Sequence, residues 1–105
     1  MAKGTAGVLI VTGASRGIGA VDSIAVGLAK EVSAQGIRVV GIRPGITQTD
    51  ILGPMGGEAM IKQVSTVIPM WRIGQASEIA EAAIWLLSPA ASYVHGTSLD
   101  VSGGR

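Results

Sequence analysis

The 105-residue sequence has no cysteine, and charged residues make up only 14% of it, against a usual share of ~25%. The absence of cysteine excludes disulfides, thiolate chemistry and zinc sites with cysteine ligands, and it fits an intracellular, cytoplasmic protein. Eight basic residues against seven acidic ones give no basic face that would favour nucleic acid. No apolar run approaches the ~20 residues of a membrane span, and the start "MAKGTAG" has no apolar signal core. We therefore expect a soluble, unprocessed chain.

Apolar residues and glycine are abundant instead. Hydrophobic residues account for 48% of the chain, and 16 glycines come on top of that. The length fits a single domain over residues 1–105, and so small a domain has few places to bury apolar groups. We expect part of the excess to be buried in a homo-oligomer. The alternative is an α/β core that is rich in alanine and glycine.

Strand and helix patterns alternate along the chain. The branched apolar run at residues 8–11 predicts a strand covered on both faces of a parallel sheet, and residues 38–42 predict a second strand, ended by Pro44 and Gly45. A helix is expected at residues 17–34, stopped by Gly36, a short one at 58–64, and a stronger one at 75–88, capped by Gln75 or Ser77. The segment "TSLDVSGG" closes with a short strand.

These elements predict a parallel sheet of about three strands with right-handed helical crossovers. Residues 8–11 are expected beside residues 38–42, with "SLDV" beyond them. The expected buried helix faces are Val21, Ile24, Ala25, Leu28, Ala29 and Val32 in the first helix, and Ile79, Ala82, Ala83, Leu86 and Leu87 in the last. Because Ile84, Trp85, Leu86 and Leu87 in succession cannot all face one core, the last helix also favours a homodimer or larger assembly.

The chemistry of the chain centres on the turn "TGASRGIG", Thr12 to Gly19. Glycines at this spacing, after a buried strand and before a helix, let the backbone approach a pyrophosphate. The N–H groups that open the helix attract negative charge. The turn therefore indicates nucleotide binding, although a merely tight turn explains the same glycines.

The same residues also spell G-x-S-x-G, the nucleophile elbow of serine hydrolases. Asp50 and the lone histidine, His95, follow Ser15 in the chain order of that class. The third glycine has no role in a hydrolase, and a lone histidine in "SYVHG" is more often a surface loop residue. A hydrolase using Ser15, Asp50 and His95 is a minor alternative.

Two segments carry a family resemblance. "TGASRGIG" resembles the cofactor-binding signature of the short-chain dehydrogenase/reductase family. "GLAKEVSAQGIRVVGIRPGITQTD" and "IPMWRIGQASEIAEAAIWLLSPAASYVHGTSLDVSGG" resemble its C-terminal part, with the nearest likeness to members described as glucose-dehydrogenase-like or 3-oxoacyl-ACP-reductase-like. The resemblance implies a shortened Rossmann-like three-layer fold and hydride transfer between NAD or NADP and a carbonyl or alcohol.

The resemblance also implies roles for particular residues. Gly13, Gly17 and Gly19, with Ile18 between the last two, would cradle the cofactor diphosphate, and Ser15 and Arg16 would lie near the adenosine ribose. Arg16 gives a slight preference for NADP, because a guanidinium can pair with a 2′-phosphate. Pro44, Gly45 and Thr49 would correspond to the P-G-x-x-x-T segment beside the nicotinamide.

The departures from the family pattern concern catalysis. Family members have a ribose-selecting strand, a catalytic serine and a Tyr-x-x-x-Lys pair between the glycine turn and this helix. Aligning the family's helix on Gly19 puts Ala14 at the tyrosine and Ile18 at the lysine, while Tyr93 has Thr97 four residues on. "SRGIGAVDS" therefore looks like a join at Gly19 and Ala20, of natural or engineered origin or left by an omission from the recorded sequence.

Two hypotheses follow beside the hydrolase. In the first, the chain is an oxidoreductase-family protein that keeps a partial dinucleotide site and has no catalytic residues. In the second, it is a non-catalytic oligomerisation module derived from the family's C-terminal region, where the late helices and the last strand commonly form subunit interfaces. No metal site is expected in either case.

Overall fold

The computed structural model describes residues 7–13, 18–48 and 57–105. The elements are β1 (Val8–Thr12), α1 (Ile18–Val32), the 3-10 turn η1 (Ser33–Gln35), β2 (Arg38–Pro44), α3 (Glu58–Ser65), α4 (Ala76–Leu87), the 3-10 turn η2 (Pro89–Ala91) and β3 (Thr97–Val101). They follow the predicted order of strands and helices closely.

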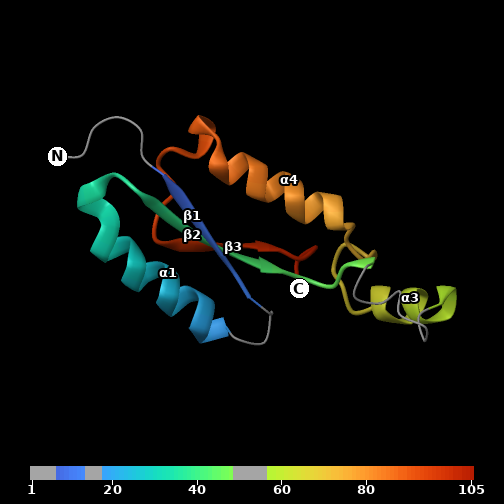
Figure 1. Ribbon diagram of the computed structural model, residues 1–105. Helices are drawn as coiled ribbons and strands as arrows, with labels where there is room; N and C mark the ends of the chain where they lie inside the picture. Colours follow the sequence, from blue (N-terminus) through green and yellow to red (C-terminus); the bar gives the residue numbers. More distant parts are fainter. Residues whose placement is uncertain (1–6, 14–17, 49–56) are drawn as a thin grey trace.

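The three strands form one parallel sheet in the order β1-β2-β3. Thr12 of β1 pairs with Ile42 of β2, and Pro44 of β2 pairs with Val101 of β3. Helix α1 lies on one face of the sheet and α4 on the other (Figure 1). This arrangement confirms the predicted shortened Rossmann-like α/β fold, including the direct pairing of the first two strands. Because the two crossovers in the order β1-β2-β3 pass over opposite faces of the sheet, they have opposite hands, and the prediction of right-handed crossovers holds for only one of them.

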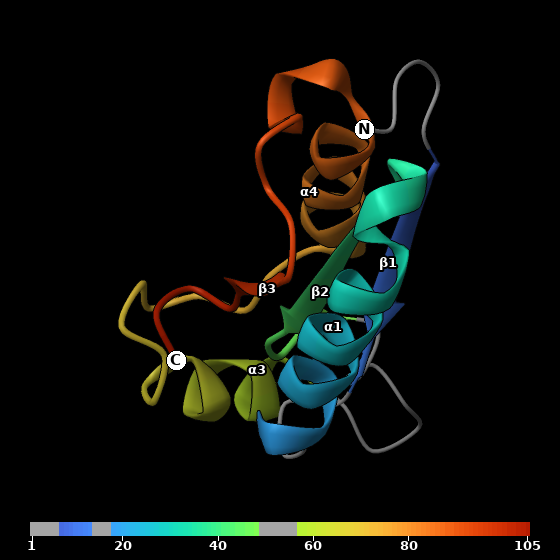
Figure 2. The same ribbon diagram turned by 90° about the vertical axis from the view of Figure 1, so that its left-hand side faces the viewer.

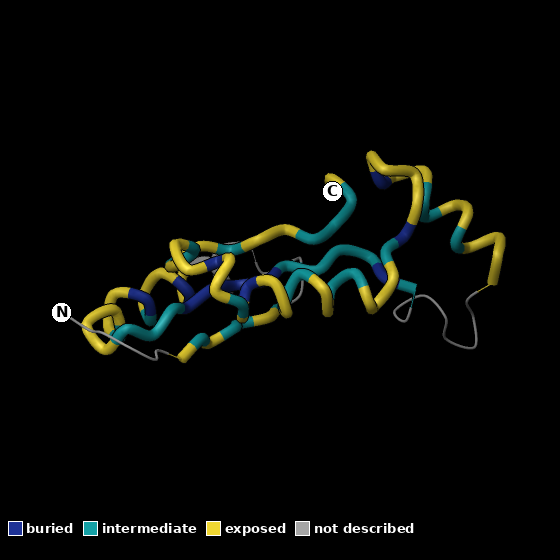
Figure 3. The backbone as a smooth tube through the Cα atoms, turned by 90° about the horizontal axis from the view of Figure 1, so that it is seen from above, coloured by how far each residue is buried: buried dark blue, intermediate teal, exposed yellow. Residues whose placement is uncertain are grey.

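The core has two parts, one on each face of the central strand β2. Val39 packs against Ala25 and Ala29 of α1. Val40 and Ile42 pack with Leu86 and Ala91 on the α4 side. Successive side chains of a strand point to opposite faces, so β2 contributes residues to both cores. Residues 39–42 of β2 form a continuous buried stretch, which Figure 3 draws in dark blue, and the other buried residues lie singly along the chain.

The strand β2 runs two residues beyond the predicted end. Pro44 belongs to it although proline has no N–H to donate. The Arg38 N–H donates to the Gly7 oxygen toward β1, and the Gly45 N–H donates to the Val101 oxygen toward β3. Because alternate residues of a parallel strand face alternate neighbours, Pro44 faces the β1 side, where β1 has already ended. Its missing donor therefore costs no ladder hydrogen bond.

Helix α1 ends at Val32, two residues before the predicted end, and the predicted stop at Gly36 ends the 3-10 turn that continues it. Gly36 follows the turn η1 in the left-handed conformation, with φ of 74°, and its N–H donates to the Ser33 oxygen. Glycine adopts this conformation without the strain that a side chain would bring. Helix α4 begins at Ala76, and its N-cap is Gln75, one of the two predicted caps.

Three apolar residues expected in the core are exposed instead. Leu9 of β1 is 45% exposed, Ile24 of α1 47% and Leu87 of α4 53%. The prediction that the first strand is covered on both faces is therefore wrong for Leu9. The physical reason is that β1 is an edge strand, while α1 packs mainly on β2 and extends toward β3.

Helix α3 has no buried residue and lies beyond the end of the sheet (Figures 1 and 2). It makes the molecule elongated, with extents of 54 × 25 × 24 Å. Within the described parts of the chain, none of the helices has the length and apolar character that crossing a membrane requires.

Candidate functional site

The carboxyl ends of β1 and β2 lie side by side and bring two predicted cofactor segments together. Thr12 pairs with Ile42, so Gly13 follows at the same edge of the sheet as Arg43 and Pro44. Helix α1, the next element along the chain, starts at Ile18. In parallel α/β sheets, ligands bind outside the carboxyl ends of the strands.

Several predicted site residues lie outside the described residues. These are Ser15, Arg16, Gly17, Thr49 and Asp50. Ile18 and Gly19 form the first turn of α1. The described part of the site therefore consists of Gly13, the start of α1, and Pro44 with Gly45.

Gly45 has a packing reason to be glycine that involves no cofactor. A Cβ atom at this position would lie 2.7 Å from both Cα and Cβ of Ser102. The Gly45 N–H also donates to the Val101 oxygen at 2.9 Å. Close approach of the chain after β3 thus accounts for Gly45, whereas the family resemblance assigned it to the nicotinamide.

Sequence reasoning missed a charged pair beside the glycine turn. The Nε and Nη2 atoms of Arg43 donate to the two carboxylate oxygens of Asp100 at 2.6 and 3.0 Å. The Arg43 side chain is 19% exposed and that of Asp100 58%. Arg43 shares the α1 face of β2 with Val39, because four residues along a strand return to the same face. The spacing of four residues from Val39 could have indicated the face on which Arg43 lies, but nothing in the local sequence indicates its partner Asp100.

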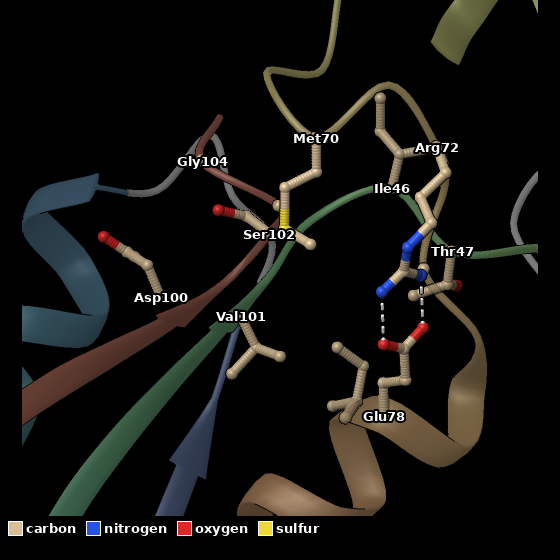
Figure 4. A pocket seen from close by; sticks show the side chains of 12 residues that line it. Ile46, Thr47, Met70, Arg72, Glu78, Asp100, Val101, Ser102 and Gly104 are labelled. Carbon is tan, nitrogen blue, oxygen red and sulfur yellow. Dashed lines mark hydrogen bonds and ion pairs between the residues drawn. The ribbon is translucent and has the colours of Figure 1, made fainter.

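A pocket of about 350 Å³ opens on the α4 side of the same sheet end. Its walls come from Ile46, Thr47, Met70, the first turn of α4 and residues 100–104. Figure 4 shows Arg72 and Glu78 facing each other at one wall, with Met70 and Ser102 at another. Gly13, Pro44 and Gly45 do not line this pocket, but Ile46 and Thr47, which belong to the predicted P-G-x-x-x-T segment, do.

The ion pair in this pocket fixes the start of α4. Arg72 donates to both Glu78 carboxylate oxygens at 2.7 and 2.8 Å, and the Gln75 backbone N–H donates to Glu78 Oε1 at 3.0 Å. The hydrogen bond from Arg72, followed by that from Gln75, lowers the pKa of Glu78 to about 2. The same hydrogen bond raises the pKa of Arg72. Glu78 is therefore ionised at neutral pH, and its carboxylate holds Arg72 to the first turn of α4.

The hydrolase alternative gains no support from His95. Its Nδ1 accepts the Val39 N–H at 3.0 Å, and its Nε2 lies 2.8 Å from the Ser33 hydroxyl, which in turn donates to the Ala29 oxygen. Val39 is the second residue of β2, so His95 lies at the amino end of the strand. Gly13, the first residue of "GASRG", lies at the opposite, carboxyl end of the sheet.

Tyr93 lies at that same amino end and is fully exposed. The next residue, Val94, accepts a hydrogen bond from Arg38, the first residue of β2. The tyrosine is therefore far along the sheet from Gly13. Among the described residues, no group of three histidine, aspartate or glutamate side chains could hold a metal ion.

The parallel three-layer arrangement places the chain among Rossmann-like α/β proteins. The family described as enoyl-(acyl carrier protein) reductase matches residues 9–105. The chain therefore belongs to the short-chain dehydrogenase/reductase family, as the resemblance of its sequence predicted.

Curated relatives agree with this assignment. The chain is 47% identical over 87 residues to the uncharacterized oxidoreductase YgfF of Escherichia coli, and it is 42% identical over 84 residues to a 3alpha-hydroxysteroid dehydrogenase of Mediterraneibacter gnavus. It is 37% identical over 86 residues to a glucose and ribitol dehydrogenase homolog of Oryza sativa. These matches cover 83%, 80% and 82% of this chain but 35%, 33% and 29% of the relatives. The chain thus spans about a third of the length of the relatives that it matches.

Proposed function

We propose that this chain is a shortened dehydrogenase that retains part of an NAD(P) site and does not catalyse hydride transfer. The observation that carries the proposal is the pairing of β1 with β2, which sets Gly13 beside Arg43 and Pro44 at the carboxyl edge of the sheet. A glycine turn, a helix start and a cation at this edge suit a diphosphate. The proposed setting is the cytoplasm, and NADP is slightly favoured over NAD because of Arg16.

Binding should be weak. The described strands run in the single order β1-β2-β3, so they lack the reversal of strand order that forms a deep cofactor crevice. The few remaining contacts must offset the entropic cost of association almost alone. We expect a dissociation constant no tighter than the millimolar range, which corresponds to about 4 kcal/mol.

The catalytic part of the proposal is negative. Hydride transfer to a carbonyl leaves negative charge on oxygen, which the family neutralises with a tyrosine proton. The family's tyrosine and lysine positions hold Ala14 and Ile18 in this sequence. The position of Tyr93 at the amino end of the sheet supports the view that it does not substitute for the missing tyrosine.

A second candidate function is that of an oligomerisation module. Ile84, Trp85 and Leu87 of α4 are 59%, 46% and 53% exposed, whereas Leu86 between them is fully buried. Three large apolar side chains on one exposed helix surface favour burial against another chain. This function requires no cofactor, so it stands independently of the dinucleotide site.

Cofactor titration tests the main proposal. Mass spectrometry first verifies the intact polypeptide, and NADPH is then titrated calorimetrically into the wild type, Gly13→Ala and Gly19→Val. We expect weak, saturable binding that both variants abolish. Gly57→Ala is the matched control, because a Cβ there meets no atom within 4 Å. Oligomerisation without any binding would favour the second candidate, and binding unchanged in both glycine variants would show that the turn is not the site.

A further inference from the structure

The strand β1 presents an open edge. Within the described part of the chain it pairs only with β2. The Arg38 N–H donates to the Gly7 oxygen at 3.0 Å, so the backbone N–H and C=O groups of the odd-numbered residues in this segment point toward β2. The backbone N–H and C=O groups of Val8, Ile10 and Thr12 therefore point away from the sheet, where another strand could pair with them.

Among the residues that the structure describes, this edge carries none of the features by which proteins normally prevent edge pairing. The strand "VLIVT" contains no charged residue and no proline, and its pairing with β2 is continuous, without a bulge. The opposite edge of the sheet differs, because β3 carries Asp100 in an ion pair with Arg43. Only the β1 edge is both uncharged and regular.

An apolar surface flanks the edge on the α1 side. Leu9 is 45% exposed and lies on the same face as Val11, which packs against the α1 core. Ser33, directly after α1, contacts His95, which lies just before β3. The flank of the helix on which Ser33 lies therefore faces β3. Ile24 precedes Ser33 by nine residues, which places it on the opposite flank, about 180° around the helix. Leu9 and the 47% exposed Ile24 thus lie together beside β1.

We propose that a second copy of this chain pairs with this edge, β1 against β1 in antiparallel orientation, to form a continuous six-stranded sheet. A twofold axis perpendicular to the sheet keeps both α1 helices on one face, so the Leu9 and Ile24 flank of each copy meets its counterpart. The uncharged edge makes this self-pairing free of like-charge repulsion. The inference places self-association at the β1 edge, on a surface distinct from the exposed residues of α4, and its test uses no cofactor.

The size of the surface sets the strength of the dimer. The 15 residues of α1 span about 22 Å, and the face presented by the strand and helix layers is roughly 20 Å deep. That gives about 400–500 Å² per copy, below the ~800 Å² of a standard stable interface. The dimer should therefore be concentration-dependent, with dissociation in the micromolar range.

The test combines sedimentation with hydrogen exchange on the intact chain. Leu9→Lys places a charge at the centre of the proposed contact. Met60→Lys is the matched control, because Met60 is 43% exposed on α3, which lies beyond the end of the sheet and belongs to neither proposed surface. We expect wild type and Met60→Lys to dimerise equally, and Leu9→Lys to weaken dimerisation by at least about tenfold. The amides of Ile10 and Thr12 should exchange slowly in the wild-type dimer and quickly in Leu9→Lys.

Val8→Pro provides a second variant should Leu9→Lys fail to fold. In the wild type the N–H of Val8 points away from β2, and proline is tolerated at the first residue of an edge strand. The variant therefore keeps the hydrogen bonds between β1 and β2 but removes a donor that a partner strand would need. A wild type that is still monomeric at millimolar concentration would overturn the inference. A dimer lost in Leu87→Lys, a variant of the exposed α4 surface, but kept in Leu9→Lys and Val8→Pro would overturn it as well. Neither result would affect the outcome of the NADPH titration.

Discussion

Gly45 lies so close to Ser102 that a Cβ atom on the glycine would stand 2.7 Å from the serine Cα. The contact joins the end of β2 to the residue that follows β3, and it closes the carboxyl edge of the sheet. It gives Gly45 a structural role, whatever binds nearby.

Gly45→Ala should therefore destabilise the fold by about 1–3 kcal/mol, since neither backbone can move without breaking the ladder between β2 and β3. Gly27→Ala is the control, because its Cβ would meet no atom within 4 Å and it lies in the interior of α1. We expect that variant to gain about 0.5–1 kcal/mol. Urea unfolding measures both changes. Equal stability of the two variants would contradict the packing role of Gly45.

His95→Phe should reduce stability by about 1 kcal/mol, because the N–H of the fully buried Val39 loses its acceptor. His95→Asn, which can offer an amide oxygen to the same N–H, should recover part of the loss. Urea unfolding of the two variants, with esterase assays alongside, distinguishes a structural histidine from a general base. Esterase activity lost in both variants without any change in stability would revive the hydrolase alternative.

Glu78 should make the chain sensitive to acid. Its pKa is lowered from 4.5 to about 2 in the folded state, so its contribution to stability is complete above pH 4.5 and is lost as the pH falls toward 2. Glu78→Gln should flatten that part of the stability profile. Glu81→Gln, an exposed position on the same helix, should leave the profile unchanged. Denaturant midpoints measured across this pH range test the prediction. If the midpoint changed with pH in both variants as it does in the wild type, Glu78 would not have this role.

Arg43 and Asp100 should affect cofactor affinity in opposite directions. Arg43→Gln removes a cation beside the glycine turn, whereas Asp100→Asn removes the negative charge that competes with a phosphate for it. We expect changes of about two- to fivefold, weaker for the first and tighter for the second, because both groups are partly solvated. NADPH titration at low ionic strength measures both. A change of the same sign in both variants would exclude Arg43 as a phosphate contact.

The sheet could be predicted because its signals are local. The β-branched runs, Gly36 and the short connection after the first strand are enough to define parallel neighbours. Burial could not be predicted in the same way. The exposure of Leu9 depends on which strand lies at the edge, and that is decided by strand pairing across the whole chain.

The candidate site shows the same division. The glycine turn and Pro44 can be read from the sequence, and the structure brings Gly13 and Pro44 to one edge. The contact between Arg43 and Asp100 joins residues 57 positions apart. No local spacing encodes such a pair, because it depends on the register of β3 against β2.

Where NADPH binds is tested most directly by following backbone amide resonances of the isotopically labelled chain during titration. We expect saturable shifts at Gly13, Arg43 and Gly45, around the carboxyl ends of β1 and β2, with none at Val39 or His95 at the amino end. The same shifts should be absent in Gly13→Ala. Saturable shifts confined to the amino end of the sheet, or no shifts at millimolar NADPH, would contradict a dinucleotide site at the glycine turn.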